Sequence, residues 1–218
     1  MAENPTILVA GFGSWVTAPV NPAAMILKGL ETRNWSDCSV TTLEVPVVTD
    51  ELYERVEAAL VGNRPDIWIG LGVSSSAAAI TPEIVGVNWR HFSIPDATGA
   101  TARMLPVIKN GPAAYNSDLP NEDFVSLLKE QGIPATLSFS AGTHLCNQML
   151  YTARHVIDRN GLPTRSGFLH VPQSTENVAG FETGRDLPAS MSLGLMTEAV
   201  AQCIEYAASR LLMSDTGE

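Results

Sequence analysis

The stretch DIWIGLGV, residues 66–73, is an almost unbroken apolar run after its first residue. Such a run is typical of a central strand in a parallel sheet, because helices cover both faces and neither face needs polar side chains. Comparable β-type runs occur at TILVAGF (6–12), SVTTLEV (39–45) and GFLHV (167–171). These four runs predict the sheet around which the rest of the chain folds.

Helical patterns alternate with these runs. Asn21 followed by Pro22 predicts a helix start, with Asn as the cap and Pro in the first turn. Thr49 is expected to cap the next helix. Three further helices are expected at 122–132, at 144–159 and from about 191 to 212. This alternation predicts a three-layer α/β/α sandwich with a mostly parallel, twisted sheet.

The remaining segments have weaker signals. Residues 82–89 and 135–139 are interpreted as two additional strands, while 93–118 and 172–190 are interpreted as long irregular stretches. No internal repeat or low-complexity linker is present, so we expect one domain over residues 1–218.

Composition excludes several classes of protein. The chain has 218 residues, a net charge of −10 and no block rich in Lys or Arg, so nucleic acid and anionic membranes are not expected as partners. The N-terminal segment lacks the pattern of a signal peptide, and no apolar window reaches the roughly 18 residues that a spanning helix needs. Three widely spaced cysteines, Cys38, Cys146 and Cys203, make neither a disulfide framework nor a zinc pair, which favours a cytoplasmic protein.

Two reactive side chains are predicted to meet beyond the sheet. Ligands of such folds bind at the carboxyl ends of the strands, which here end near Phe12, Val73, Phe139 and Val171. Cys146 follows one of these ends and His170 stands at another, so neighbouring strands are expected to bring them together.

Cys146 and His170 together have the chemistry of a thiol nucleophile and its base. A thiol attacks as the thiolate, which a helix N-terminus and a nearby imidazole both favour. Free N–H groups of the first helical turn can hold an oxyanion, and His170 can move the proton. A carboxylate would then orient the imidazole, and Glu83 is one candidate.

Structural roles for these residues stay open on spacing alone. Cys146 shares helical spacing with apolar residues and is equally interpretable as a core thiol. His170 is interpretable as a hydrogen-bonded core histidine, and Glu83 as a solvated carboxylate at a strand end. His144 is a rival partner for the thiol, although it is not on the same helical face as Cys146.

Other enzyme classes lack their motifs. GxGxxG, GK[ST] and G-x-S-x-G are all absent, which argues against dinucleotide, ATP and serine hydrolase chemistry. His91, His144 and His155 form no metal-binding spacing, and Cys38 and Cys203 are interpreted as structural.

Seven segments together resemble the pyroglutamyl peptidase I (pyrrolidone-carboxylate peptidase) family of cysteine peptidases. SAGTHLCNQMLY resembles its nucleophile segment, ITPEIVGVNW its glutamate segment and GFLHVP its histidine segment. Four flanking stretches also match in the same order: ILVAGFG with NPA at 21–23, SIPDATG at 93–99, NGPAAYNSDLP at 110–120 and PASMSL at 188–193.

This resemblance implies an activity and a set of roles. It implies that Cys146 is the nucleophile, His170 the general acid/base and Glu83 the orienting carboxylate. It implies removal of N-terminal pyroglutamyl residues from peptides, without metal or cofactor, by a cytoplasmic homo-oligomer, either tetramer or dimer. The substrate-binding residues it implies are Phe12, Trp15, Asn21, Val73, Ile94, His144 and Leu145.

The chain departs from the family pattern around the expected acyl pocket. Trp15 stands where a second phenylalanine is usual, and Val73 replaces a glutamine. Ser93 replaces an arginine, and His144 stands at a usually aromatic position. These departures leave two other functions open: a related thiol amidohydrolase with a different acyl group, and a non-catalytic binding protein on the same fold.

Overall fold

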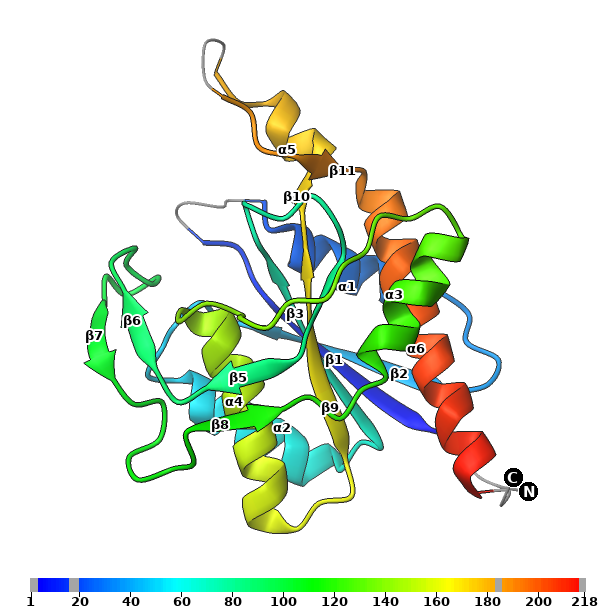
Figure 1. Cartoon of the computed structure of the whole chain (residues 1–218), viewed down its shortest axis with the longest axis horizontal. Coiled ribbons are helices and arrows are strands. Elements are labelled where there is room, and N and C mark those ends of the chain that lie inside the picture. The colour runs from blue at the N-terminus through cyan, green and yellow to red at the C-terminus, as the bar shows by residue number, and fades with distance from the viewer. Residues whose placement is uncertain (1–3, 16–19, 183–185, 216–218) are drawn as a thin grey trace.

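A five-stranded sheet forms the centre of the computed structural model, which describes residues 4–15, 20–182 and 186–215 (Figure 1). The strand order is β2-β1-β3-β9-β4. The four predicted strands run parallel, and the short strand β4 pairs antiparallel with β9 at one edge. Their bounds are β1 Thr6–Phe12, β2 Ser39–Val45, β3 Ile67–Val73, β4 Thr81–Glu83 and β9 Arg165–Val171.

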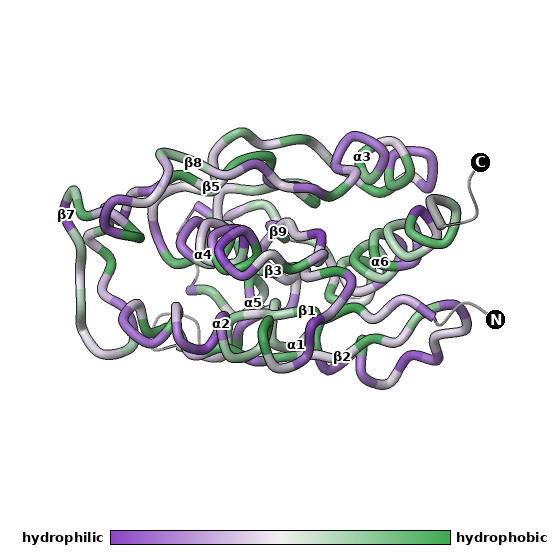
Figure 2. The backbone as a smooth tube through the Cα atoms, turned by 90° about the horizontal axis from the view of Figure 1, so that it is seen from below, coloured by the Kyte–Doolittle hydropathy of each residue, from purple (hydrophilic) through white to green (hydrophobic). Residues whose placement is uncertain are grey.

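Alternation along the strands divides the core into two apolar clusters, one on each face of the sheet. In β1, Ile7 and Val9 belong to one cluster, whereas Leu8 and Ala10 belong to the other. Helices α1 (Pro22–Glu31), α3 (Asn121–Glu130) and α6 (Leu193–Asp215) pack on the first face. Helices α2 (Leu52–Asn63) and α4 (Leu145–Asn160) pack on the second face. The predicted three-layer α/β/α fold is confirmed, and Figure 2 shows hydrophobic and hydrophilic residues alternating along the flanking helices.

One of the two predicted helix caps is confirmed, and the other is wrong. Asn21 caps α1, with its Oδ1 accepting a hydrogen bond from the N–H of Ala23. Gly161 ends α4 in the left-handed conformation, at φ +58°. The prediction that Thr49 caps α2 is wrong. Thr49 is buried, and its hydroxyl instead donates to Oε1 of Gln148 on α4.

The predicted strand 82–89 is divided between two sheets. Residues 81–83 form β4, whereas β5 (Val85–Val87) leaves the central sheet and pairs with β8 (Ala114–Asn116). A second ribbon pairs β6 (Arg90–Phe92) with β7 (Ala102–Leu105). The stretch 93–118 is therefore not wholly irregular, and Figure 1 shows both ribbons to one side of the central sheet.

The predicted strand 135–139 is wrong as a regular strand. This segment makes only isolated bridges to the β4 region, at Ala135 with Ile80 and at Ser138 with Glu83. Its neighbour β4 is three residues long, so it offers too short an edge for a continuous ladder. The stretch 172–190 contains three short elements, β10 (Gln173–Ser174), α5 (Thr175–Ala179) and β11 (Ser190–Met191), and its residues 183–185 lie outside the described part of the chain.

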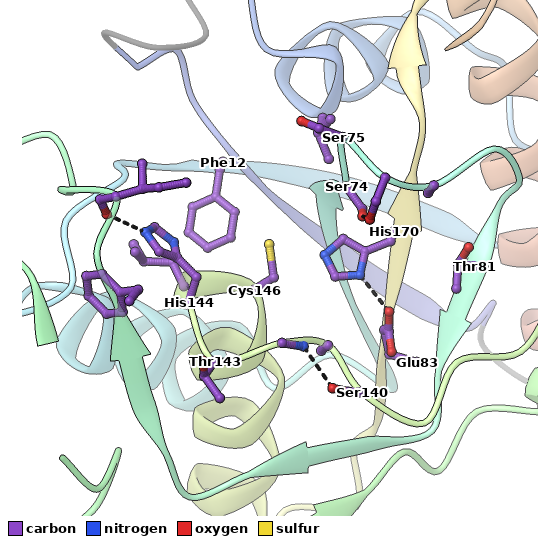
Figure 3. Close-up of a pocket in the computed structure, with 18 of the residues that line it drawn as sticks. Phe12, Ser74, Ser75, Thr81, Glu83, Ser140, Thr143, His144, Cys146 and His170 are labelled. Atoms are coloured by element: carbon purple, nitrogen blue, oxygen red, sulfur yellow. Dashed lines mark hydrogen bonds and ion pairs between the residues drawn. The ribbon is translucent and has the colours of Figure 1, made fainter. Parts of the chain in front are cut away.

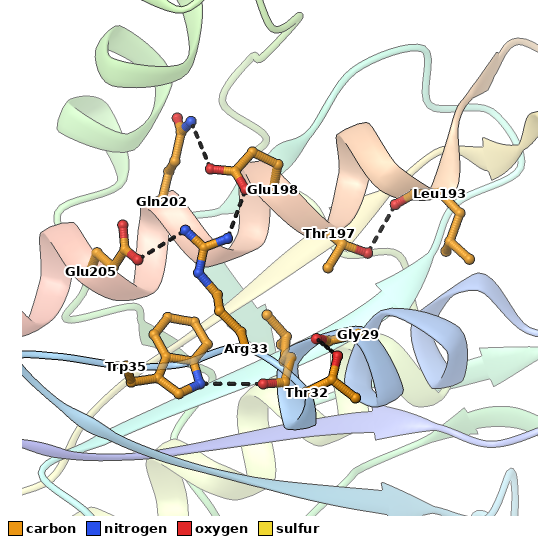
Figure 4. A network of polar contacts seen from close by, with 10 residues as sticks. Gly29, Thr32, Arg33, Trp35, Leu193, Thr197, Glu198, Gln202 and Glu205 are labelled. Carbon is orange, nitrogen blue, oxygen red and sulfur yellow. Dashed lines mark hydrogen bonds and ion pairs between the residues drawn. The ribbon is translucent and has the colours of Figure 1, made fainter.

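A polar cluster joins the end of α1 to α6 (Figure 4). The Arg33 guanidinium donates to Glu198 at 2.7 Å and to Glu205 at 3.0 Å, and it lies over the ring of Trp35. Because these groups are partly exposed, such pairs contribute little to stability. The apolar contacts beneath them hold the two helices together. None of the helices in the described ranges combines the length and hydropathy that a membrane crossing requires.

The second-face core should depend on Phe168, which is fully buried in β9. We expect Phe168→Ala to lower the free energy of unfolding by about 3–5 kcal/mol, because the lost ring leaves a cavity. Guanidinium denaturation followed by tryptophan fluorescence measures this. Phe139 is 71% exposed, so Phe139→Ala should change the unfolding free energy by no more than about 0.5 kcal/mol. Equal losses in the two variants would contradict the assigned packing.

Candidate active site

Cys146, His170 and Glu83 come together at the sheet from three different elements. Cys146 is the second residue of α4, His170 is the penultimate residue of β9, and Glu83 ends β4. Alternation in β9 puts His170 on the same face as Phe168, which is the face covered by α4. In Figure 3, the imidazole of His170 lies between the thiol and the carboxylate.

The route by which Cys146 and His170 approach differs from the prediction. They do not follow neighbouring strands, because β4 lies between β9 and the segment that precedes α4. Instead, α4 packs directly against β3 and β9, so its first turn faces the end of β9. The same insertion of β4 brings Glu83 beside His170, since β4 and β9 are paired.

The His170–Glu83 pair is short and almost fully buried. Nδ1 of His170 lies 2.6 Å from Oε1 of Glu83, and the two side chains are 8% and 3% exposed. Burial disfavours the charged imidazole, but its interactions with Cys146 and then with Glu83 outweigh burial and raise the pKa of His170 to about 10. The geometry therefore favours a protonated imidazole held between the Cys146 thiol and the Glu83 carboxyl group.

The thiol of Cys146 occupies a space that Gly72 leaves open. A Cβ atom on Gly72 would stand 2.8 Å from Sγ of Cys146 and 2.8 Å from the ring of Phe168. Such distances are shorter than van der Waals contact, so only glycine fits here with this placement of the thiol. The requirement for Gly72 was not predicted, although the Gly-x-Gly ending of the central strand is a visible signal of close approach.

The first turn of α4 has free N–H groups beside the thiol. The capping residue, His144, makes no side-chain bond to the helix start, so the N–H groups of Leu145 and Cys146 have no partner within the helix. These donors and the positive end of the helix favour negative charge next to Sγ. This is the arrangement that an oxyanion would need.

Two buried amides hold this helix start in place. Asn147 bonds the backbone of Val87 through both its oxygen and its nitrogen, and it also donates to the carbonyl of Trp89. Gln148 bonds the hydroxyl and the carbonyl of Thr49. Sequence reasoning missed both residues. The only available signal was a polar pair directly after Cys146, which is also compatible with a solvated helix face.

One cavity of about 960 Å³ contains the three candidate catalytic residues (Figure 3). Every residue predicted to bind substrate lines this cavity: Phe12, Trp15, Asn21, Val73, Ile94, His144 and Leu145. Sequence reasoning did not predict the other polar lining, which includes Ser74, Ser75, Ser76, Thr81, Ser140, Thr143 and Gln173. Figure 3 places Phe12 and His144 on one side of Cys146, and His170 with Glu83 on the other.

The amide of Asn21 is already engaged within the protein. Its Oδ1 caps α1, and its Nδ2 donates to the carbonyl of Gly13 at 2.9 Å. Asn21 therefore fixes the start of the first loop against α1 and lines the cavity while doing so. Residues 16–19 of the stretch GFGSWVTAPVNP lie outside the described part of the chain.

His144 is bonded away from the thiol. Its Nε2 lies 3.0 Å from the carbonyl oxygen of Ile94, and its ring packs against Phe92 with centroids 4.3 Å apart. The ring of Trp15 is also near, with centroids 5.8 Å apart. This geometry places His144 in the cavity wall, while His170 is the imidazole that lies against the Glu83 carboxylate.

The two remaining cysteines are buried in the first-face core. Burial raises the pKa of Cys203 far above its ordinary value and, to a smaller extent, that of Cys38. Both thiols are therefore neutral at physiological pH, and all three cysteines are free. In the described ranges, no three His, Cys, Asp or Glu side chains are grouped so as to hold a metal ion.

We expect Gly72→Ala to displace the Cys146 thiol, because the added methyl group would overlap Sγ. The rate of Cys146 alkylation by iodoacetamide should then fall roughly tenfold or more, since a thiol moved away from His170 is less often the thiolate. Gly62→Ala is the matched control, because a Cβ at that position meets no atom within 4 Å. Alkylation of Gly72→Ala at the wild-type rate would contradict this account of the thiol.

Known proteins resemble this chain over most of its length. The family described as Pyroglutamyl peptidase matches residues 5–210. A pyrrolidone-carboxylate peptidase of Pyrococcus furiosus is 35% identical over 206 residues, which cover 94% of this chain and 99% of the relative. One of Aliivibrio fischeri is 33% identical over 211 residues, covering 96% and 94% respectively.

Solved structures of pyroglutamyl peptidases also superpose on almost the whole chain. A mutant pyrrolidone carboxyl peptidase (A199P) from P. furiosus superposes with a TM-score of 0.90 at 35% identity, covering 94% of this chain and 99% of that one. Pyroglutamyl peptidase I from Bacillus amyloliquefaciens superposes with a TM-score of 0.88 at 31% identity, covering 94% and 98%. The resemblance carried by the short motifs thus extends over almost the whole chain and its fold, and the chain belongs to the pyroglutamyl peptidase family.

Proposed function

We propose that the protein is a cysteine exopeptidase that removes N-terminal pyroglutamyl residues from peptides, with Cys146, His170 and Glu83 as its catalytic residues. The observation that carries the proposal is the buried 2.6 Å contact between His170 and Glu83, placed beside a thiol at a helix start. Family membership supplies the substrate class, and the cavity around Cys146 supplies a place for it.

In the first step, Sγ of Cys146 attacks the carbonyl carbon of the pyroglutamyl group. The new oxyanion is held by N–H groups of the first turn of α4. His170 then donates its proton to the leaving amine as the C–N bond breaks, which leaves a thioester on Cys146. Glu83 keeps the imidazole oriented and stabilises its positive charge.

In the second step, water hydrolyses the thioester. Neutral His170 takes a proton from the attacking water, and the carbonyl oxygen returns to the same N–H groups. Collapse of this intermediate breaks the C–S bond and releases free pyroglutamate. The thiolate and the imidazolium are restored, so the proposed cycle uses these side chains, the main-chain N–H groups of α4 and water.

The acyl side of the cavity suits a small, flat, neutral ring. Phe12 and Trp15 provide apolar walls there, as a lactam ring requires. The ring also carries one N–H and one carbonyl, and each costs about 1–3 kcal/mol if it is buried without a partner. Val73 offers no polar side chain, so we propose that main-chain groups near Val73 meet part of this need.

The compartment and the assembly belong to the same proposal. Three free cysteines are compatible with a reducing cytoplasm, and the family resemblance suggests a homo-oligomer, either a tetramer or a dimer. Size-exclusion chromatography with light scattering measures the mass in solution. A monomer at micromolar concentration would exclude the proposed assembly without affecting the proposed chemistry.

One alternative function has a specific observation in its favour. Apolar Val73 and small Ser93 both line the cavity where the family pattern has glutamine and arginine, so the acyl group accepted by this chain is open to change. The alternative is a thiol amidohydrolase that prefers another acyl group. A panel of fluorogenic N-acyl amides, with pyroglutamyl included, distinguishes the two. Preferred turnover of the pyroglutamyl amide supports the main proposal.

Cys146→Ala should abolish hydrolysis of a pyroglutamyl aminomethylcoumarin amide while the circular dichroism spectrum is unchanged. Cys146→Ser should also be nearly inactive, because a hydroxyl is hardly ionised near neutral pH. Cys203→Ala is the control, since that thiol is buried away from the cavity and should be dispensable. Wild-type turnover by Cys146→Ala would rule out thiol catalysis, whereas labelling of Cys146 without any turnover would favour the alternative acyl group.

The pH dependence should follow His170. Its imidazolium is the form that protonates the leaving amine, so kcat/KM should fall as the pH rises through about 10. Glu83→Gln removes one of the interactions that raise this pKa, so the alkaline limb should move to lower pH. His170→Ala should lower kcat by about 10²–10⁴-fold. An unmoved limb in Glu83→Gln, or a loss in His144→Ala equal to that in His170→Ala, would contradict these roles.

A further inference from the structure

His144 is the unusual residue of the cavity wall, and its environment determines which of its nitrogens carries the proton. Nε2 faces the carbonyl oxygen of Ile94 at 3.0 Å. A carbonyl can only accept a hydrogen bond, so Nε2 must be the nitrogen that bears hydrogen. In the neutral imidazole, Nδ1 is then a bare lone pair and acts as an acceptor.

The imidazole is kept neutral by its surroundings. Burial against the cavity wall lowers the pKa of His144, and this effect outweighs the Ile94 carbonyl and the Asp96 carboxylate, which act in the opposite direction. The ring is also fixed in orientation, because it packs on Phe92 and close to Trp15. At neutral pH, His144 therefore presents one tautomer in one position.

Nδ1 of His144 has no hydrogen-bond partner among the described residues and keeps some solvent-accessible surface. His144 lines the cavity together with Phe12, and Figure 3 shows both on the side of Cys146 opposite to His170. The leaving amine has to lie within reach of His170, so the acyl group of the substrate must lie on the opposite side of Cys146, beside His144.

The other side chains predicted for this slot offer little to a ring N–H. Oδ1 of Asn21 already accepts from Ala23 as the helix cap. Phe12, Val73 and Leu145 have no polar side-chain atom, and the indole of Trp15 can only donate. The carbonyl of Ile94 already accepts from His144. Nδ1 of His144 is thus the open side-chain acceptor in the predicted slot.

We propose that His144 determines acyl specificity by accepting, through Nδ1, the hydrogen bond of the pyroglutamyl ring N–H. The inference rests on the proposed function and deepens it. In this chain a histidine would do what an apolar aromatic side chain cannot, and it would compensate for the loss of polar side-chain contacts at Val73. The thiol, His170 and Glu83 are unaffected by this choice, because His144 makes no bond to them.

The test compares two aminomethylcoumarin amides that differ at one position of the ring. One carries the pyroglutamyl group, and the other carries the matching cyclic ketone, in which CH₂ replaces the ring N–H. Wild-type protein should prefer the pyroglutamyl amide by about tenfold or more in kcat/KM, because the ketone leaves Nδ1 unpaired. His144→Phe should reduce that preference to about threefold or less, mainly through KM.

Two further variants separate the hydrogen bond from packing. His144→Asn keeps an amide oxygen near the position of Nδ1, so it should retain more of the preference than His144→Phe does. His155→Phe is the matched control on the same helix, because His155 lies outside the cavity and should leave the preference unchanged. If His144→Phe fails to fold, imidazole nitrogen NMR on Cys146→Ala still tests the idea. The Nδ1 resonance should shift when a pyroglutamyl dipeptide is added.

Each outcome supports or overturns a distinct statement. Equal turnover of the two amides by wild-type protein, or an undiminished preference in His144→Phe, would overturn the role of His144 and assign the ring N–H to a main-chain acceptor. The proposed function would stand in both cases. Hydrolysis of neither amide by wild-type protein would instead overturn the proposed function itself. An Nδ1 resonance unmoved by the dipeptide at saturation would also overturn the role of His144.

Discussion

The close approach of α4 to the glycine-bearing face of the central strand is the constraint on which the site depends. Trp68, Gly70 and Gly72 share this face of β3 because side chains alternate along a strand. A Cβ on Gly70 would lie 2.4 Å from the ring of Phe168, and one on Gly72 would lie 2.8 Å from the thiol of Cys146. The missing side chains leave room for the ring of Phe168 in the core and for the thiol of Cys146 above it. The stretch 66–73 therefore forms the central strand of the sheet. It also determines how closely α4, the helix that carries the thiol, can pack against that strand.

The buried His170–Glu83 pair serves the proposed chemistry rather than the stability of the fold. Removing two charged groups from water is expensive, and their attraction only partly offsets that cost. Oε2 of Glu83 is buried without a hydrogen-bond partner among the described residues, which adds to the cost. The apolar cores on the two faces of the sheet have to offset this cost in the free energy of folding. What the pair provides is an imidazole fixed in orientation, with its pKa raised, at the point where β4 inserts beside β9.

The sheet and the helix order were predictable because buried parallel strands and capped helices have strong local signals. The bounds of β1 and β2 agree with the runs at 6–12 and 39–45. The errors arise where tertiary pairing overrides a local pattern. The run 135–139 has strand character but only a three-residue neighbour, and Thr49 resembles a helix cap but is used by Gln148. The grouping of Cys146, His170 and Glu83 was anticipated from the motifs, whereas no periodicity indicates that an antiparallel strand is inserted beside β9.

The candidate catalytic residues and the predicted acyl slot are built on different kinds of structure, and this difference explains why one can change without the other. Cys146, His170 and Glu83 stand on a helix and two paired strands, whose positions the whole core determines. Much of the slot comes from loops, including those around Trp15, Ser74 and Ile94, and loops accept substitution more readily than packed elements. His144 lies between the packed elements and the loops, since it is the N-cap residue of α4 while its ring reaches the loop around Ile94. With the role proposed for His144, a substitution there would change what the cavity recognises, while the helix start stays anchored by Asn147 and Gln148.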